Sequence, residues 1–469
     1  MEETELSVMS KTGKLFGGID VGSSSIKTSI IDAGTGKIIS ARKRRYRGDM
    51  LAGNSVQVNE IYSEFIKEIG SLSNEGVTSI GLSCMAPILI PVDSNFESLT
   101  AIPYNSLLGS EFFGKNLNFN FRRINFNSPN AQMFPQKILW LRKNSPEVLE
   151  EASYIVDLNA YLLGRVCGKH EGTPVQDYPT AVEWGLVDSR KRDWWKPVAE
   201  KLGIRAKLPE LVEPEFAIDI GDTRLCIGTV DTLVSSLGAI GLDSSLLFVS
   251  NGSTLCAGFV SKKPVITDNL YCDAYFSGRY LIDGCNSQFS TVLDFAERLF
   301  RTKIDINDVD EKPTEVTFMP YLTGERCPLF NTSLRGGFYG FNAETSIDDI
   351  KKSVVHSLAY LTIDMLDAVI KLSGRRREIV VGGGVGGRTI GPIVATVAGM
   401  NYNFLNYDPG SVGAALIAMK SSSTIASYPL RTFRYIGGET ETYTPDRSLN
   451  AHAAAYERFT KLRRKLENF

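Results

Sequence analysis

The sequence predicts an α/β fold made of two similar domains, and three observations support this prediction. Short apolar strands alternate with helical segments, which is typical of a partly parallel sheet. A hairpin of two apolar strands near the start of the chain returns in similar form beyond its middle. The 469 residues are also enough for two or three domains of ordinary size.

The first hairpin is expected at residues 15–20 and 26–31, after a loose leader at residues 1–14. Both runs are apolar and rich in Ile, and a turn of small residues joins them.

The second hairpin is expected at residues 245–250 and 255–260. Its likeness to the first is a weak internal repeat, which predicts a boundary near residues 241–243. We therefore expect an N-terminal domain at residues 15–241 and a C-terminal domain at residues 242–469.

A long helix is predicted after Ser346, because Ser346 and Asp349 have the spacing of a capping pair. Apolar residues then recur at helical spacing as far as Leu372, and Gly374 is placed to end the helix. His356 lies off the apolar stripe, so we expect it to be partly exposed.

The charge balance argues against nucleic acid or an anionic membrane as the main partner, because 51 Lys and Arg nearly match 53 Asp and Glu. Basic runs at residues 42–45, 375–377 and 463–465 are interpreted as solvated ends of elements. No apolar stretch reaches the roughly 18 residues of a membrane-spanning helix, and the first residues do not resemble a signal peptide. We expect a cytoplasmic protein.

The seven cysteines are scattered and include no C-x-x-C pair, and the chain has only three histidines. A disulfide framework or a zinc site would need closer clusters of these residues. Reduced structural thiols are therefore expected.

The turn of the first hairpin has the residue types that hold phosphate, namely Gly22, Ser23, Ser24 and Ser25, followed by Lys27. Glycine lets the backbone approach closely, and successive N–H groups and hydroxyls can surround phosphate oxygens. Asp20, at the end of the first strand, is placed to hold a hydrated Mg²⁺. The second hairpin offers a similar turn at Gly252, Ser253 and Thr254. An ordinary polar turn is the alternative, and no Walker-type loop is present.

A glycine-rich run at residues 382–387 lies between a predicted strand at 378–381 and a predicted helix at 389–398. It contains the spacing G-x-G-x-x-G, so a dinucleotide site with Asp408 on the ribose is one interpretation. The distance to that acid is long, and this interpretation leaves both phosphate turns unexplained.

Asp231 follows a short strand and opens an apolar helix near the domain boundary. It could accept a proton from a substrate hydroxyl. It could also be an ordinary helix cap, and spacing alone favours the cap.

Taken in order, these segments resemble the FGGY carbohydrate kinases, members of the wider group of actin-like ATPases. The most specific stretches are residues 318–328, FMPYLTGERCP, and residues 334–340, LRGGFYG. The resemblance implies two ribonuclease-H-like domains with a catalytic cleft between them. It also implies transfer of the γ-phosphate of Mg-ATP to a hydroxyl of a sugar, a small-molecule substrate, with ATP and Mg²⁺ as cofactors.

The resemblance assigns roles residue by residue. Residues 18–27 match the first phosphate motif of the family and residues 251–254 the second. The adenosine motif, Gly382, Gly383, Gly384 and Arg388, replaces the dinucleotide interpretation. Asp20 corresponds to the magnesium ligand, and Asp231 to the catalytic base, which reverses the preference for a helix cap.

The substrate side departs from the family pattern. Met85 stands where Gln is usual, and Ala86 and Pro87 replace the Arg-Glu pair of glycerol kinases, which disfavours glycerol. The polar groups expected to bind the sugar are Ser83, Tyr104, Asp177, Asp231 and Thr232, with Met85 and Leu108 as an apolar wall against its carbon face. A pentulose such as xylulose is the favoured substrate, and gluconate or another sugar acid or polyol is the alternative. A catalytically silent ligand-sensing relative, an NAD-dependent oxidoreductase and a homodimer are left open.

Overall fold

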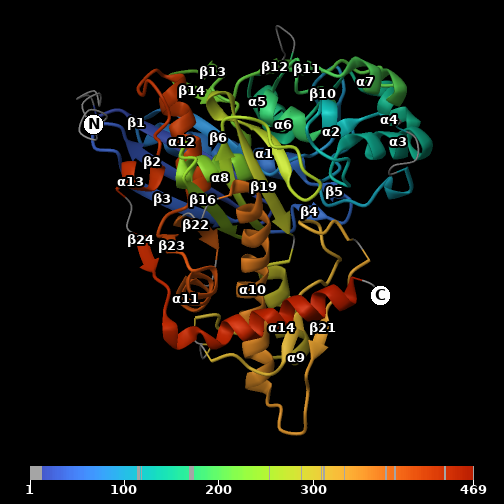
Figure 1. Ribbon diagram of the computed structural model, residues 1–469. Coiled ribbons are helices and arrows are strands. Elements are labelled where there is room, and N and C mark those ends of the chain that lie inside the picture. The colour runs from blue at the N-terminus through green and yellow to red at the C-terminus, as the bar shows by residue number, and fades with distance from the viewer. Residues whose placement is uncertain are drawn as a thin grey trace. The chain divides into compact units, whose positions relative to one another are not determined.

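The computed structural model describes residues 13–112, 117, 119–167, 174–252, 254–286, 288–307, 309, 312–331, 333–374, 378–384, 387–437 and 440–467 (Figure 1). Ser253, the basic run at 375–377 and most of the predicted leader lie outside these residues. The chain divides into two compact units, and both are discontinuous in sequence. Unit 1 comprises Met1–Leu242, Asp273–Gly278 and Asp408–Gly438, and unit 2 comprises Asp243–Cys272, Arg279–Tyr407 and Glu439–Phe469. This differs from the two continuous domains expected from the sequence.

Unit 1 contains a seven-stranded sheet in the order β13-β14-β6-β1-β2-β3, with the short β15 also paired to β6. Its strands are β1 (Leu15–Val21), β2 (Ser25–Asp32), β3 (Lys37–Arg45), β6 (Val77–Cys84), β13 (Ala217–Ile220), β14 (Thr223–Cys226) and β15 (Thr229–Val230). β1 runs antiparallel to β2 and parallel to β6, and β2 runs antiparallel to β3. The predicted first hairpin is therefore confirmed at the centre of a mixed sheet.

The two faces of this sheet are covered differently. On one face, apolar residues such as Ile19 and Ile26 pack with α1 (Val58–Asn74) into a core that includes Phe65. On the other face, glycines replace side chains, and α12 (Pro409–Ser421) packs directly on the backbone. A Cβ at Gly18 would lie 1.8 Å from the carbonyl oxygen of Ser411, and one at Gly81 would lie 1.9 Å from that of Ala414. Glycine is therefore required at both positions.

Unit 1 contains a second apolar cluster, which includes Phe134, Trp184 and Trp195. The remaining helices of unit 1 are α2 (Phe121–Ile124), α3 (Phe134–Asn144), α4 (Pro146–Glu151), α5 (Leu158–Cys167), α6 (Tyr178–Glu183), α7 (Lys196–Leu202), α8 (Asp231–Ile240) and α13 (Thr432–Tyr435). Its short strands are β4 (Leu51–Ala52), β5 (Ser55–Val56), β7 (Ile90–Val92), β8 (Tyr154–Val156), β9 (Val175–Asp177), β10 (Val187–Asp188), β11 (Asp193–Trp194) and β12 (Glu210–Val212).

Unit 2 repeats the central arrangement of unit 1 in a second seven-stranded sheet, with the order β18-β19-β17-β16-β22-β23-β24. The strands of this sheet are β16 (Leu246–Asn251), β17 (Leu255–Ser261), β18 (Tyr271–Tyr275), β19 (Arg279–Asn286), β22 (Glu378–Gly384), β23 (Tyr402–Leu405) and β24 (Thr440–Tyr443), and the last three residues of β18 are counted with unit 1. β16 is antiparallel to β17 and parallel to β22, as β1 is to β2 and β6. The second predicted hairpin and the internal repeat are both confirmed.

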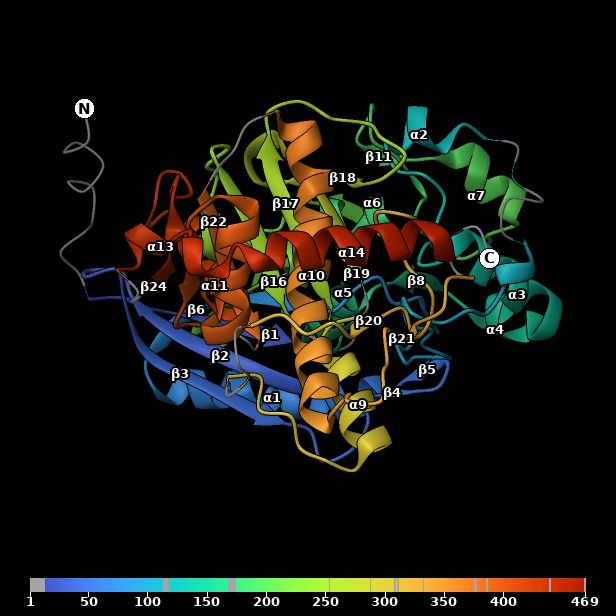
Figure 2. The same cartoon turned by 60° about the horizontal axis from the view of Figure 1, so that its bottom comes forward.

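Helix α10 (Ile347–Ser373) is the central helix of unit 2, and α14 (Ala451–Leu466) crosses it in both views (Figures 1 and 2). The predicted capping box of Ser346 and Asp349 and the predicted end at Gly374 are both present. By length and composition α10 could cross a membrane, but most of its most apolar 18-residue stretch is buried in the structure. The other elements are α9 (Ser290–Phe300), α11 (Gly387–Ala398), β20 (Thr317–Met319) and β21 (Gly337–Tyr339).

The expected partial exposure of His356 is wrong. His356 is 1 % exposed, and its ring meets that of His452 of α14 edge-on, with centroids 4.8 Å apart. A one-sided apolar stripe assumes a surface helix, whereas α10 is covered on several sides.

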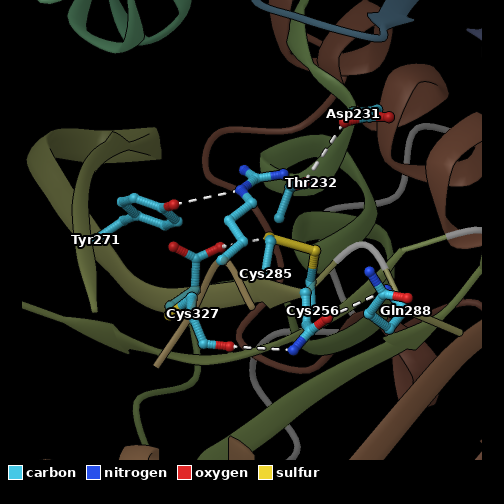
Figure 3. The surroundings of a disulfide bond; sticks show 10 residues. Asp231, Thr232, Cys256, Tyr271, Cys285, Gln288 and Cys327 are labelled. Carbon is cyan, nitrogen blue, oxygen red and sulfur yellow. Dashed lines mark hydrogen bonds between the residues drawn. A yellow bond between two sulfur atoms is a disulfide. The ribbon is translucent and has the colours of Figure 1, made fainter. Parts of the chain in front are cut away.

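The expectation that all cysteines are reduced is also wrong. Cys256 of β17 and Cys285 of β19 are directly opposite in the antiparallel pair and form a disulfide, with Cα atoms 4.2 Å apart (Figure 3). All seven cysteines lie in the described ranges, and the other five are free. The two partners are 29 positions apart in sequence, so only the strand register brings them together.

Candidate active site

A row of polar side chains crosses the unit 1 sheet from β6 to β2. Strand register places Ser83 of β6 beside Asp20 of β1, and Asp20 beside Lys27 of β2. Because directly paired residues project from the same face of a sheet, the three side chains meet. Ser83 Oγ donates to Asp20 Oδ1 at 2.6 Å, and Lys27 Nζ donates to Asp20 Oδ2 at 3.1 Å.

The first turn of α12 packs against this row of side chains. Asp408 is the N-cap of α12, where its carboxylate accepts a hydrogen bond from Ser411 N at 2.9 Å. Its other oxygen accepts from Lys27 Nζ at 2.8 Å. Gly410 lies directly against Asp20, because a Cβ there would be 2.9 Å from the carboxyl carbon of Asp20. Asp20, Lys27 and Asp408 are therefore held together by packing as well as by charge.

These contacts perturb the ionisation of both partners. Burial raises the pKa of Asp20; Lys27 opposes the rise, and the negative charge of Asp408 adds to it. The pKa of Lys27 is raised, chiefly by Asp20 and despite partial burial of the amine. Lys27 therefore stays protonated at neutral pH.

Asp231 is the first residue of α8, directly after β15, as the sequence predicts. The N-cap is Val230, and no side chain caps the helix, so the alternative of a capping Asp231 is not what the structure contains. Desolvation raises the pKa of Asp231 to about 7, with a further contribution from the charge of Asp20. Thr232 Oγ1 donates to Asp231 Oδ1 at 3.4 Å. A carboxylate with this pKa is matched to proton transfer at neutral pH.

The predicted phosphate turn of unit 1 lies at the end of the same row. Gly22 N donates to Ser25 O at 3.1 Å and closes the turn between β1 and β2. Ser23 and Ser24 are at least partly exposed, whereas Ser25 is buried. The hydroxyls of Ser23 and Ser24 are thus accessible to a ligand near Asp20 and Lys27.

The remaining predicted nucleotide residues belong to unit 2. Gly252 N donates to Thr254 O at 3.1 Å in the second hairpin turn, and the preceding Asn251 donates from Nδ2 to Tyr402 Oη at 3.0 Å. Gly382, Gly383 and Gly384 form the end of β22, and Gly383 has φ of +72°, which favours glycine.

Arg388 is exposed in the first turn of α11. Residues 385 and 386 of the predicted glycine turn lie outside the described residues. Asp408, the ribose contact of the dinucleotide interpretation, belongs to unit 1, where it forms an ion pair with Lys27.

The predicted substrate residue Asp177 is fully buried and already bonded. It caps α6 by accepting from Thr180 N at 2.9 Å, and it also accepts from Gln176 Nε2 at 2.9 Å and from Asn159 Nδ2. Burial raises its pKa. Asp157, in the same network, accepts from Ile88 N and Trp184 Nε1 and has its pKa raised to about 7 by burial. In this structure the network holds the segments around β6 and β9 together.

The other predicted substrate residues are distributed differently from one another. Ser83 is fully buried and directs its hydroxyl to Asp20. Met85 is 2 % exposed and belongs to the apolar core with α1, whereas Leu108 packs against the cluster around Trp184. They therefore pack against two separate clusters. Tyr104 and Thr232 are partly exposed.

Sequence reasoning missed the contributions of Asp408 and Gly410 to the site. The segment Asp408-Pro409-Gly410-Ser411 has the pattern of an N-cap followed by proline, so the start of α12 could have been found. Its contact with Lys27, 381 positions earlier, has no local signal.

Comparison with known proteins identifies the class of molecule. The model of the FGGY family of carbohydrate kinases, N-terminal domain, matches residues 15–224, and that of the C-terminal domain matches residues 247–422. These matches and the two-unit α/β architecture define a sugar kinase, an enzyme whose phosphoryl donor is expected to be ATP. The chain belongs to the FGGY family of carbohydrate kinases. The resemblance found in the sequence is thereby confirmed, and the oxidoreductase is set aside.

The chain is also similar to individual members of this family. It is 23 % identical to a xylulose kinase of Lactococcus lactis, over 92 % of each chain. It is 25 % identical to a gluconokinase of Bacillus subtilis, over 48 % of this chain and 49 % of that one.

Two solved structures from Lactobacillus acidophilus have closely similar folds. A gluconate kinase has a TM-score of 0.84 and a ligand-bound xylulose kinase has a TM-score of 0.83, each at 19 % identity over 97 % of this chain and 98 % of the other. At this identity the likeness establishes the fold.

Proposed function

We propose that this kinase transfers the γ-phosphate of Mg-ATP to a hydroxyl of a pentulose, with xylulose the favoured acceptor. The observation that carries the proposal is the grouping of Asp231, Asp20 and Lys27, in which Asp231 has a pKa of about 7. A base of that pKa can accept the proton of a hydroxyl, and a nearby cation can stabilise the charge of the transferred phosphoryl group.

Asp231 is the proposed general base. It accepts the proton of the attacking hydroxyl as the bond to phosphorus forms. Its partial exposure leaves room for a substrate, and Thr232 orients one carboxylate oxygen. The neighbouring charge of Asp20 raises the proton affinity of Asp231, which makes it a better acceptor at neutral pH.

The residues present fit a magnesium ion. Around Lys27 lie the carboxylates of Asp20 and Asp408, and Asp231 interacts electrostatically with Asp20, so negative charge exceeds positive charge here. Among the described residues, no group of three or more His, Cys, Asp or Glu side chains is placed to hold a metal ion. Mg²⁺ does not need such a group, because one or two carboxylates and the phosphates of the substrate usually hold it. Asp20 is the proposed ligand. When bound, Mg²⁺ would neutralise charge on the transferred phosphoryl group.

The nucleotide is proposed to bind through both hairpin turns and the adenosine motif. Gly22, Ser23, Ser24, Ser25 and Lys27 would hold phosphates in unit 1, and Gly252, Ser253 and Thr254 in unit 2. Gly382, Gly383, Gly384 and Arg388 would contact the adenosine. Backbone N–H groups, hydroxyls and one lysine are the donors that phosphate oxygens accept from most readily.

The choice of a pentulose rests on the relatives and on the substrate segments. The xylulose kinase of Lactococcus lactis aligns with nearly the whole chain, and Ala86 and Pro87 do not supply the Arg-Glu pair of glycerol kinases. Gluconate is the second candidate, supported by the gluconokinase relative and the gluconate kinase fold. Tyr104 and Thr232 are the proposed sugar contacts with exposed surface, and Ser83 and Asp177 are proposed to act by positioning Asp20 and α6.

The test is a coupled ADP-release assay with xylulose, ribulose, gluconate, glycerol and a hexulose at equal concentrations. We expect xylulose to give the largest kcat/KM. The Asp231→Asn variant is the matched control for adventitious ATPase activity. Glycerol as the best acceptor would refute the substrate assignment, whereas gluconate as the best acceptor would select the second candidate.

A further inference from the structure

Strand β3 carries four consecutive basic residues, Arg42, Lys43, Arg44 and Arg45, along the edge of the unit 1 sheet (Figure 2). The sequence alone suggested a solvated basic run. Because successive residues of a strand project to opposite faces, the run divides into two pairs with different surroundings.

Arg42 and Arg44 are on the α1 face, where carboxylates neutralise them. Arg42 donates from Nη1 to Ser71 Oγ at 3.1 Å and forms an ion pair with Glu75. Arg44 forms ion pairs with Glu64, at 3.3 Å, and with Glu68. These partners all belong to or directly follow α1.

Lys43 and Arg45 are on the opposite face, which holds the candidate active site. Lys43 is directly paired with Lys27, and Arg45 with Ser25 of the phosphate turn. The polar row of Ser83, Asp20 and Lys27 therefore continues to Lys43 at the sheet edge. Neighbouring strands are about 4.8 Å apart, so Lys43 lies one strand spacing from Lys27. Both side chains on β3 are exposed.

On this face the start of α12 contacts β1 and β2 at the row of Asp20 and Lys27, whereas Lys43 and Arg45 of β3 are exposed. Ser411 Oγ meets Ser29 Oγ at 2.7 Å, and the first residues of the helix, Asp408 and Gly410, reach Lys27 and Asp20. The pair of Ser25 and Arg45 is one step further toward the turn that begins at Gly22. Arg45 and Lys43 thus border the open side of the turn.

The charge of the candidate active site indicates what Lys43 and Arg45 could do. Lys27 bonds to two carboxylates, those of Asp20 and Asp408, and Asp231 interacts electrostatically with both Asp20 and Lys27, so in the part of the chain that the structure describes these three carboxylates outnumber the lysine. A nucleotide polyphosphate would enter a site with an excess of negative charge. Two further cations on the same face would offset that excess and attract the anion from solution.

We propose that Lys43 and Arg45 bind the phosphate groups of the nucleotide as an outer basic rim of the first phosphate turn. This inference rests on the proposed nucleotide site at Asp20 and Lys27. The carboxylate of an acidic acceptor such as gluconate has the same anionic chemistry, and the test separates the two.

The test compares three variants by direct calorimetric binding of ATP and by steady-state kinetics. The double variant Lys43→Gln/Arg45→Gln is expected to raise the Kd for ATP about tenfold. The Kd of the double variant should also depend less on the NaCl concentration than that of the parent, between about 50 and about 300 mM, because salt screens the attraction of these two charges for ATP. The matched control, Arg42→Gln, removes one charge of the same strand on the α1 face and should leave the Kd within twofold. Lys27→Met marks the site itself and should weaken ATP binding more than either.

Each outcome has one meaning. An unchanged Kd in the double variant, with Lys27→Met weakened, would overturn the basic rim and leave the nucleotide site in place. An unchanged Kd in Lys27→Met would overturn the nucleotide site and the rim with it. A double variant with a raised KM for gluconate and an unchanged Kd for ATP would assign the rim to the acceptor and overturn the proposal. Equal melting temperatures of the double variant and the parent would confirm that binding, not folding, is measured.

Discussion

Lys27 donates a hydrogen bond to Asp408 at 2.8 Å across 381 positions of sequence. Asp408 is at the same time the N-cap of α12, so one carboxylate both caps a helix and bonds to Lys27, next to the proposed phosphate turn. The start of α12 and the candidate active site are therefore a single structural feature.

The substitution Asp408→Asn separates these two duties. Asn caps helices about as well as Asp, so the melting temperature should change little. The loss of a negative charge next to Lys27 should tighten ATP binding severalfold, while the looser Lys27 and Asp20 lower kcat by about tenfold. Calorimetry and steady-state kinetics measure the two effects. Weaker ATP binding at an unchanged melting temperature would contradict this account.

Asp231→Asn should reduce sugar-dependent ADP formation by about 10²–10⁴-fold, because the general base is lost. ATP binding should persist, since the phosphate turns are untouched. The measurement is kcat on the best acceptor, together with the calorimetric Kd for ATP. Turnover within a few-fold of the parent would show that another group accepts the proton.

The pH dependence of activity should follow the raised pKa of Asp231. A general base works only when deprotonated, so kcat/KM should rise as the pH rises through about 7 and level off above it. Asp157 and Glu325 also have pKa values raised to about 7 by burial, so the profile is compared with the residual activity of Asp231→Asn. A rising limb that survives in the variant would assign it to another group.

Gly410→Ala should impair catalysis through position alone. The new methyl group would lie 2.9–3.1 Å from the carboxyl atoms of Asp20, so the carboxylate or the helix must move. We expect kcat to fall by about 10–100-fold, the scale of a misplaced catalytic group. Gly70→Ala in α1 is the matched control: its Cβ meets no atom within 4 Å, and alanine favours the helix by roughly 0.5–1 kcal/mol. Equal kcat values for the two variants would contradict the contact.

The disulfide between Cys256 and Cys285 can be tested by counting the reactive thiols of the protein. Five thiols should react in the denatured, unreduced protein, and seven after treatment with a dithiol. Seven reactive thiols before reduction would show that the pair is not oxidised in the isolated protein.

Local patterns predicted the elements well. The hairpins at β1–β2 and β16–β17, the capping box at Ser346 and the strand-to-helix junction at Asp231 all have their signals within a few residues. Features set by packing between distant segments were not predictable in this way. The burial of His356 depends on α14, the disulfide depends on the register of β17 with β19, and Ser83 turns to Asp20 because β6 pairs with β1.

The roles of residues in the site came from family resemblance more than from spacing. Spacing in the sequence favours Asp231 as a helix cap. Its raised pKa results from burial and from the charge of Asp20, and both depend on the fold. Asp408 entered only the dinucleotide interpretation, which was not adopted, because sequence order places it after the glycine-rich run, whereas the fold places it beside Lys27.

The glycine contacts between α12 and its neighbours bear on how the chain is made. In the folded protein, α12 covers the bare backbone at Gly18, Gly81 and Gly238, and a Cβ at Gly238 would lie 1.8 Å from the carbonyl oxygen of Pro409. Because synthesis starts at the N-terminus, residues 1–242 are made well before the segment Asp408–Gly438. One face of the unit 1 sheet therefore lacks its covering helix until that segment leaves the ribosome. Unit 1 is started first and finished almost last, so a nascent chain stalled before α12 exposes that face to chaperones and to aggregation.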